Sequence, residues 1–133
     1  FVSMPIGPDP NSSIRIKQGI SNEGRLVPPI SPAEKPEQTL LVEIRPMTGR
    51  THQIRVHSHY IGCTVTGDKL YGLADDGFIK WLEQGQSYLD QTGFSTPRQL
   101  LHAMEIGFIH PESNKKLTIR ADDSKMMRMI PTQ

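Results

Sequence analysis

Residues 45–57 read RPMTGRTHQIRVH, a short turn that leads into a helical pattern. Thr51 is a favourable N-cap residue, and Gly62 ends the pattern as the left-handed residue that often follows a helix. If residues 51–62 form a helix, their apolar side chains gather on one side, and Arg55 lies with two histidines on the other. This stretch therefore predicts a short amphipathic helix that directly follows a turn.

A half-buried strand is expected just before that turn. Leu40, Val42 and Ile44 alternate with polar or charged residues over 39–45, and Pro46 ends the alternation. The other expected elements follow from the same kind of periodicity. They are a possible strand over 13–17, a short strand over 63–66, a helix over about 76–84, a polar loop over 87–97, a β-hairpin with strands over 101–109 and 117–121, and a frayed helix or packing segment over 126–129.

The 133 residues carry 15 Lys and Arg against 14 Asp and Glu, and a single cysteine. No apolar run approaches the ~18 residues of a membrane span, and one cysteine excludes an internal disulfide framework. Residues 1–37 hold seven of the 11 prolines, so we expect this part to be loop-rich, with an edge strand or extended loop over 27–33. Residues 38–133 are then the main sheet and helix portion. A net charge of +1 is too small to indicate a nucleic-acid-binding protein by itself.

Three histidines near the expected helix suggest a metal site only at first sight. On a helix, His52 and His59 are about 10.5 Å apart along the axis, whereas a zinc ion binds its nitrogen ligands at about 2.0 Å. His57 lies on another face, and no Cys or acidic residue is suitably spaced. We therefore expect no metal ion here.

Basic side chains are in excess between residues 43 and 72, where four of them face only two acidic ones. Arginines in such a grouping suit RNA phosphates, but an ordinary solvated helix face has the same composition. Asp68 follows a glycine in a turn, and Asp75 and Asp76 precede a helix, so turn formation and N-capping are their expected roles. Cys63, next to a helix end, is expected to be a packing residue.

Four blocks of sequence, in this order, carry a more specific pattern: TGRTHQIRVH at 48–57, GDKLYG at 67–72, LHA at 101–103 and FIHP at 108–111. With them the chain closely resembles the RluA-type pseudouridine synthases, which isomerise uridine to pseudouridine in ribosomal and transfer RNA. Together with the expected elements, the resemblance implies an α+β fold with a mixed, mostly antiparallel sheet and flanking helices, as part of a catalytic domain. It also implies RNA as the partner and the cytoplasm as the location.

The resemblance further implies a chemistry that needs no metal or cofactor. The family breaks the N1–C1′ bond of a flipped-out uridine, turns the base and rejoins it through C5. An aspartate is essential and an arginine pairs with it; Arg55 matches that arginine, and Ile54 matches the apolar residue that lines the site. A guanidinium stays charged at all relevant pH values and can hold a carboxylate in a fixed orientation. We also expect Arg50, His52 and Lys69 to contact RNA.

One part of the family pattern is missing. The family's catalytic aspartate lies in an R-L-D-x-x-T-S-G-like motif upstream of the Arg55 block, and this sequence contains no such motif. Residues 88–93, YLDQTG, lack the arginine, have another Asp-to-Thr spacing and follow Arg55, so Asp90 is not expected to be the nucleophile. We therefore expect residues 1–133 to be the C-terminal portion of a catalytic domain, partnered by a missing N-terminal part of the same protein and inactive alone. The alternatives are a non-catalytic RNA-binding module derived from that fold, and a structural or assembly domain.

Overall fold

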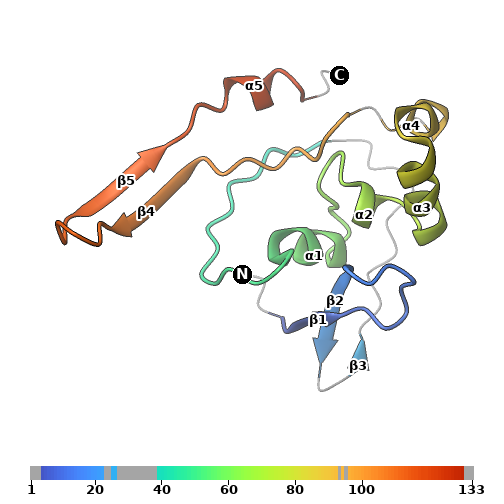
Figure 1. Ribbon diagram of the computed structural model, residues 1–133, viewed down its shortest axis with the longest axis horizontal. Helices are drawn as coiled ribbons and strands as arrows, with labels where there is room; N and C mark the ends of the chain where they lie inside the picture. Colours follow the sequence, from blue (N-terminus) through green and yellow to red (C-terminus); the bar gives the residue numbers. More distant parts are fainter. Residues whose placement is uncertain (1–3, 23–24, 27–38, 93, 95, 131–133) are drawn as a thin grey trace. The chain divides into compact units, whose positions relative to one another are not determined.

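The computed structural model describes residues 4–22, 25–26, 39–92, 94 and 96–130. The chain forms two compact units, Phe1–Gln99 (unit 1) and Leu100–Gln133 (unit 2). Both contain helices and short antiparallel strands (Figure 1). This confirms the expected α+β class, although the strands in the described ranges form two separate small sheets instead of one mixed sheet.

The strands of unit 1 form a small antiparallel sheet in the order β1-β2-β3. They are β1 (Ile6–Pro8), β2 (Gln18–Asn22) and β3 (Arg25–Leu26). Ile6 lies opposite Ile20, and Pro8 lies opposite Gln18 at the end of β1. A proline fits there because its missing N–H is tolerated at the end of an edge strand.

Four helices complete unit 1: α1 (Gln53–Tyr60), α2 (Lys69–Gly72), α3 (Asp75–Gln84) and α4 (Gln86–Thr92). The helix expected over 51–62 is confirmed as α1, and that over 76–84 as α3. Gly62 has the left-handed φ of 80° that the sequence suggested after α1. The N-cap of α1 is His52, itself left-handed with φ 57°, so the expected Thr51 cap is wrong.

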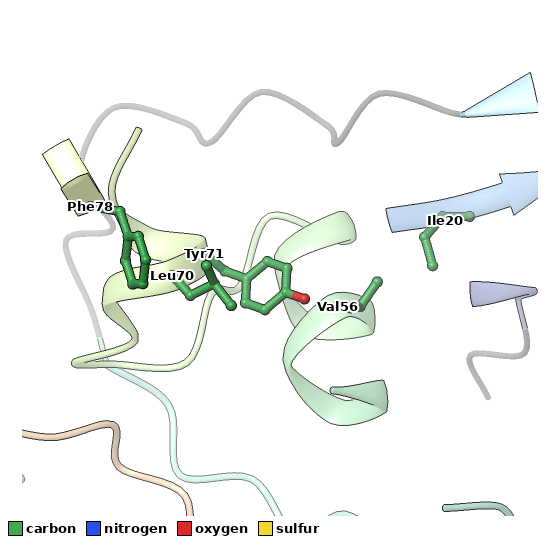
Figure 2. Packing of buried hydrophobic residues seen from close by; sticks show 5 residues of the cluster. All are labelled: Ile20, Val56, Leu70, Tyr71 and Phe78. Carbon is green, nitrogen blue, oxygen red and sulfur yellow. The ribbon is translucent and has the colours of Figure 1, made fainter. Parts of the chain in front are cut away.

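The core of unit 1 is a cluster of five buried apolar residues, one or two from each of four elements. They are Ile20 of β2, Val56 of α1, Leu70 and Tyr71 of α2, and Phe78 of α3. Figure 2 shows the Tyr71 ring between Leu70 and Val56, with its hydroxyl pointing toward α1. Full burial of such a side chain stabilises the fold by about 1.5–3 kcal/mol. The cluster therefore fixes α1 and α2 against each other.

Unit 2 is a β-hairpin followed by a short helix. Strand β4 (Glu105–Ile109) pairs antiparallel with β5 (Lys116–Arg120), and α5 (Ser124–Met127) follows. Ile106 lies opposite Ile119 and Phe108 opposite Leu117, as the alternation of apolar residues required. The hairpin and the short helix near residue 126 are thus confirmed.

Other expected elements are absent or differ. Residues 39–45 form no strand; Leu40, Val42 and Ile44 are exposed and have no ladder partner among the described residues. A period-2 pattern alone does not make a strand, because a strand needs a neighbour to pair with. The same applies to 63–66 and to 13–17, where the strand instead starts at Gln18. The expected loop over 87–97 contains α4, anchored by the buried Leu89. The expectation for 27–33 lies outside the described residues.

Candidate functional site

The polar side of α1 packs against an aromatic ring instead of facing only solvent. His52, Arg55 and His59 are spaced three and four residues apart, so they lie on one face of the helix. The Arg55 Cζ atom lies 5.0 Å from the centre of the Tyr71 ring, and the two imidazole centres lie 5.8 Å from it. A guanidinium within about 6 Å of a ring centre is attracted by the ring's π face. The solvated helix face that the sequence allowed is therefore wrong for these three residues.

Arg55 makes a two-pronged ion pair with a carboxylate of its own chain. Its Nε donates to Asp68 Oδ2 at 2.7 Å, and its Nη2 donates to Asp68 Oδ1 at 2.8 Å. The Asp68 side chain is completely buried, and that of Arg55 is 15% exposed. Hydrogen bonding to the Asp68 carboxylate raises the pKa of Arg55 above its ordinary value. An aspartate from outside these 133 residues stays a prediction as the partner of Arg55. The structure adds Asp68 as a partner within the chain.

Asp68 also begins the neighbouring helix. Its Oδ1 accepts hydrogen bonds from the backbone N–H groups of Leu70 at 3.1 Å and Tyr71 at 3.3 Å, which makes it the N-cap of α2. This confirms the capping role expected for Asp68. Because Tyr71 belongs to the first turn of α2, the same carboxylate positions both the guanidinium and the ring beneath it.

The Tyr71 hydroxyl links the histidine to the sheet. It accepts the backbone N–H of Gln18 at 3.0 Å and lies 3.0 Å from Nδ1 of His52. Burial and the neighbouring Arg55 charge lower the pKa of His52, and burial raises the pKa of Tyr71. The hydrogen bond between the Tyr71 hydroxyl and Nδ1 therefore fixes the orientation of the His52 ring, and the tautomer of that ring decides which of the two groups donates.

These side chains border a cavity of about 370 Å³ within unit 1. Its lining combines the polar groups of His52, Arg55 and Asp68 with the rings of Phe78 and Trp81. Pockets of this size, apolar with a few convergent polar groups, are typical binding sites for small molecules or for single flipped-out groups. Tyr71 and the two aromatic residues of α3 were not expected at the site. For Phe78 and Trp81 the sequence showed only a helical spacing of apolar residues, which does not indicate a binding site.

The other residues expected at the site are dispersed. Lys69 borders the cavity, but it is buried and its Nζ donates to the backbone oxygens of Thr96 at 3.1 Å and Pro97 at 2.6 Å. This geometry gives Lys69 a role in holding residues 96–97. Arg50 is exposed and borders a separate depression of about 320 Å³. Ile54 is half-buried on α1 and does not line the cavity that contains Arg55.

Asp90 does not belong to this constellation. It is exposed on α4, where it accepts a hydrogen bond from Gln86 Nε2 at 2.9 Å, and it does not line the cavity. Among the described residues, no group of three or more His, Cys, Asp or Glu side chains is arranged to hold a metal ion. Within the same ranges, no helix is long and apolar enough to cross a membrane.

The chain is similar in sequence to enzymes that modify RNA. It is 37% identical over 113 residues to the ribosomal large subunit pseudouridine synthase C of Vibrio cholerae, which covers 77% of this chain and 32% of that protein. It is 48% identical over 84 residues to the protein of the same name from Buchnera aphidicola, covering 62% and 23%. It is 34% identical over 90 residues to the tRNA pseudouridine synthase C of Vibrio vulnificus, covering 68% and 33%.

The chain thus spans about a third or less of the length of these curated relatives. No family model matches it, and no solved structure matches it. The similarity covers most of the chain, and identities of 34 to 48% recur across relatives that share one kind of name. Arg55 and Asp68, which form the paired centre of the site, lie in the two blocks that carry the resemblance. The similarity confirms, over most of this chain, the resemblance to the RluA-type RNA pseudouridine synthases.

Proposed function

We propose that this chain is the Arg55-bearing, C-terminal portion of the catalytic domain of an RNA pseudouridine synthase that acts on ribosomal or transfer RNA. The observation that carries the proposal is the buried, two-pronged pair of Arg55 and Asp68 at the edge of the cavity. The names of the relatives support RNA as the substrate class. A cytoplasmic location is part of the same proposal.

The role of Arg55 in this proposal follows from its unused donors. A guanidinium has five N–H groups, and Asp68 takes one from Nε and one from Nη2. Within the described ranges the other three have no acceptor, and we propose that they hold a second carboxylate, the catalytic aspartate of the R-L-D-x-x-T motif that this sequence lacks. That aspartate would come from an N-terminal part of the same protein. The 133 residues alone are then inactive.

The cavity can receive the reacting base. A uridine must leave the stack to be isomerised, and an unstacked base is held by aromatic faces and by hydrogen bonds to its edges. Phe78 and Trp81 supply aromatic faces, and His52 supplies a polar imidazole edge. No metal or cofactor enters this proposal. Arg50, on the exposed surface, stays our candidate for an RNA phosphate contact.

Release of tritium from RNA labelled at uridine C5 tests the proposal. We expect none from the 133-residue chain and turnover from the protein encoded by its whole reading frame. In that protein, Arg55→Lys should lower turnover by about 10- to 100-fold, because lysine keeps the charge but loses the two-pronged geometry. The matched control is Arg15→Lys, a basic residue outside the cavity lining. Robust turnover by the isolated chain, or unchanged turnover of Arg55→Lys, would overturn the assignment.

A second function is favoured by one observation, the lack of the R-L-D-x-x-T motif. Without a catalytic aspartate, the same fold would serve as an RNA-binding module. The reading frame upstream of the Phe1 codon discriminates the two: the motif there supports the enzyme, and an initiator Met directly before Phe1 supports the module. RNA binding that weakens steeply with salt fits both, whereas weak binding insensitive to salt points to a structural or assembly domain.

A further inference from the structure

Asp68 is held by donors of its own fold. Its Oδ1 accepts three hydrogen bonds, from Arg55 Nη2 and from the backbone N–H groups of Leu70 and Tyr71. Its Oδ2 accepts one, from Arg55 Nε. The side chain is also fully buried, although it borders the cavity. The Asp68 carboxylate therefore acts mainly on Arg55 and on the first turn of α2.

The same contacts fix the orientation of the guanidinium. Two parallel hydrogen bonds define the plane and the direction of Arg55, because they join two donors of one rigid fork to two oxygens of one rigid carboxylate. The Tyr71 ring, 5.0 Å from Cζ, supports one side of that plane. The edge of the fork opposite to Asp68 carries the remaining N–H groups, for which the described residues supply no acceptor.

We propose that Asp68 is a positioning residue: it holds Arg55 by the Nε and Nη2 edge, so that the Nη1 edge is presented for a second carboxylate in a single orientation. The inference rests on the proposed function for the identity of that carboxylate, but the positioning itself does not. Asp68 also cancels the charge of Arg55 within the fold. Recognition at the outer edge then depends on hydrogen-bond geometry more than on net charge, which favours a planar carboxylate over a diffuse set of phosphates.

A competing explanation is that Asp68 is only the N-cap of α2. The two explanations separate in Asp68→Asn, because asparagine is as good an N-cap as aspartate but offers one oxygen in place of two and no charge. Asp75→Asn is the matched control. Asp75 is also a hydrogen-bonded aspartate of unit 1, but its partners are Ser12, Ser13 and Lys17.

Arginine side-chain NMR on the full 133-residue chain reads the positioning directly. The Arg55 Nε–H signal is assigned by its disappearance in Arg55→Lys. In the unmodified chain it should exchange with water at least about tenfold more slowly than the Nε–H of an exposed arginine, because its bond to Asp68 must break first. Asp68→Asn should remove this protection while the far-ultraviolet circular dichroism stays unchanged, and Asp75→Asn should preserve it.

The outcomes divide cleanly. Fast exchange of the Arg55 Nε–H in the unmodified chain overturns the proposal, even if Asp68→Asn fails to fold. Retained protection in a folded Asp68→Asn chain also overturns it and leaves Asp68 as a cap. In the protein encoded by the whole reading frame, Asp68→Asn should lower kcat by about tenfold or more with KM for RNA changed less than about twofold, because lost orientation affects the reacting centre more than RNA binding. If tritium release fails altogether while the NMR result holds, the proposed function falls and the positioning stands.

Discussion

Gly67 should be hard to replace by any residue that carries a Cβ atom. Its φ of 77° lies in the left-handed region, and a Cβ atom built on it would overlap the backbone oxygen of Arg98 and Oγ1 of Thr96 and lie 2.9 Å from the Arg98 carbonyl carbon. Gly62 has almost the same φ, 80°, but a Cβ there has no neighbour within 4 Å. Gly67→Ala and Gly62→Ala therefore both place alanine in a left-handed backbone conformation, but only Gly67→Ala brings the new Cβ atom into steric overlap.

The magnitude follows from the separate contributions. A left-handed conformation costs alanine about 1–2 kcal/mol, and alanine regains about 0.4–1 kcal/mol by restricting the unfolded chain. Gly62→Ala should thus lower the free energy of unfolding by about 1 kcal/mol. Gly67→Ala adds an overpacking cost of about 1–3 kcal/mol, at the upper end because the obstacle is backbone. Relief of the clash would move residues 96–98, which also hold the Lys69 ammonium.

Urea unfolding of both variants, followed by tryptophan fluorescence of Trp81, measures the difference. We expect Gly67→Ala to lose at least about 1 kcal/mol more than Gly62→Ala. Equal losses would refute the reasoning, because they would mean that residues 96–98 do not lie against Gly67. A chain that no longer unfolds cooperatively after Gly67→Ala, beside a cooperative Gly62→Ala chain, would support it.

Three further outcomes are expected. Burial opposes ionisation of Asp75, but the hydrogen bonds from Lys17 and Ser12 outweigh it and lower the pKa of Asp75 below the ordinary 3.8. The ionised Asp75 therefore stabilises the fold above that value, and this contribution is lost as pH falls through the folded pKa. Asp75→Asn should accordingly make the free energy of unfolding fall less steeply below about pH 4. Lys69→Met should lower the free energy of unfolding in urea by about 2–3 kcal/mol, because it leaves two carbonyl oxygens without their donor. The control Lys80→Met, at an exposed lysine, should lower it by about 0.5 kcal/mol or less. Similar losses in the two variants would argue that Lys69 does not hold residues 96–97. Tyr71→Phe should lower the free energy of unfolding by about 1 kcal/mol, because it removes the hydroxyl that bonds Gln18 and His52. It should also change the ¹⁵N chemical shift of His52 Nδ1, and an unchanged shift would contradict the hydrogen bond.

The parts of the fold that were predictable depend on local signals. Helices α1 and α3 and the β4–β5 hairpin follow from periodicity within a single segment and from nearby turn residues. The strand expected over 39–45 rested on the same periodicity, but its formation requires a partner that no local pattern can supply. Helix α4 was missed because its residues are mostly polar, and the single buried Leu89 is too little to produce a helical pattern.

The site was predictable only in outline. Arg55 and His52 were found from the sequence block that contains them, and both border the cavity. The partner of Arg55 was not found, since Asp68 is 13 residues away and helix periodicity relates only residues within one helix. The capping signal of Asp68 was correct but concealed its second role. Lys69, chosen for its charge, is turned inward by two carbonyl oxygens that no sequence motif announces.

Because the same carboxylate of Asp68 caps α2 through Oδ1 and orients Arg55 through both oxygens, stability and site geometry are linked in this protein. A change that removes the carboxylate leaves the Arg55 charge with little access to water, and an unpaired charge with little hydration destabilises the fold. Activity lost in such a variant is therefore no proof of a role in the reaction. Asparagine reduces the loss of stability, because it keeps the N-cap of α2, whereas alanine removes the cap as well as the charge. If the positioning is real, the losses caused by Asp68→Asn and Arg55→Lys should be less than additive when combined, since either change alone already breaks the single arrangement that both residues serve.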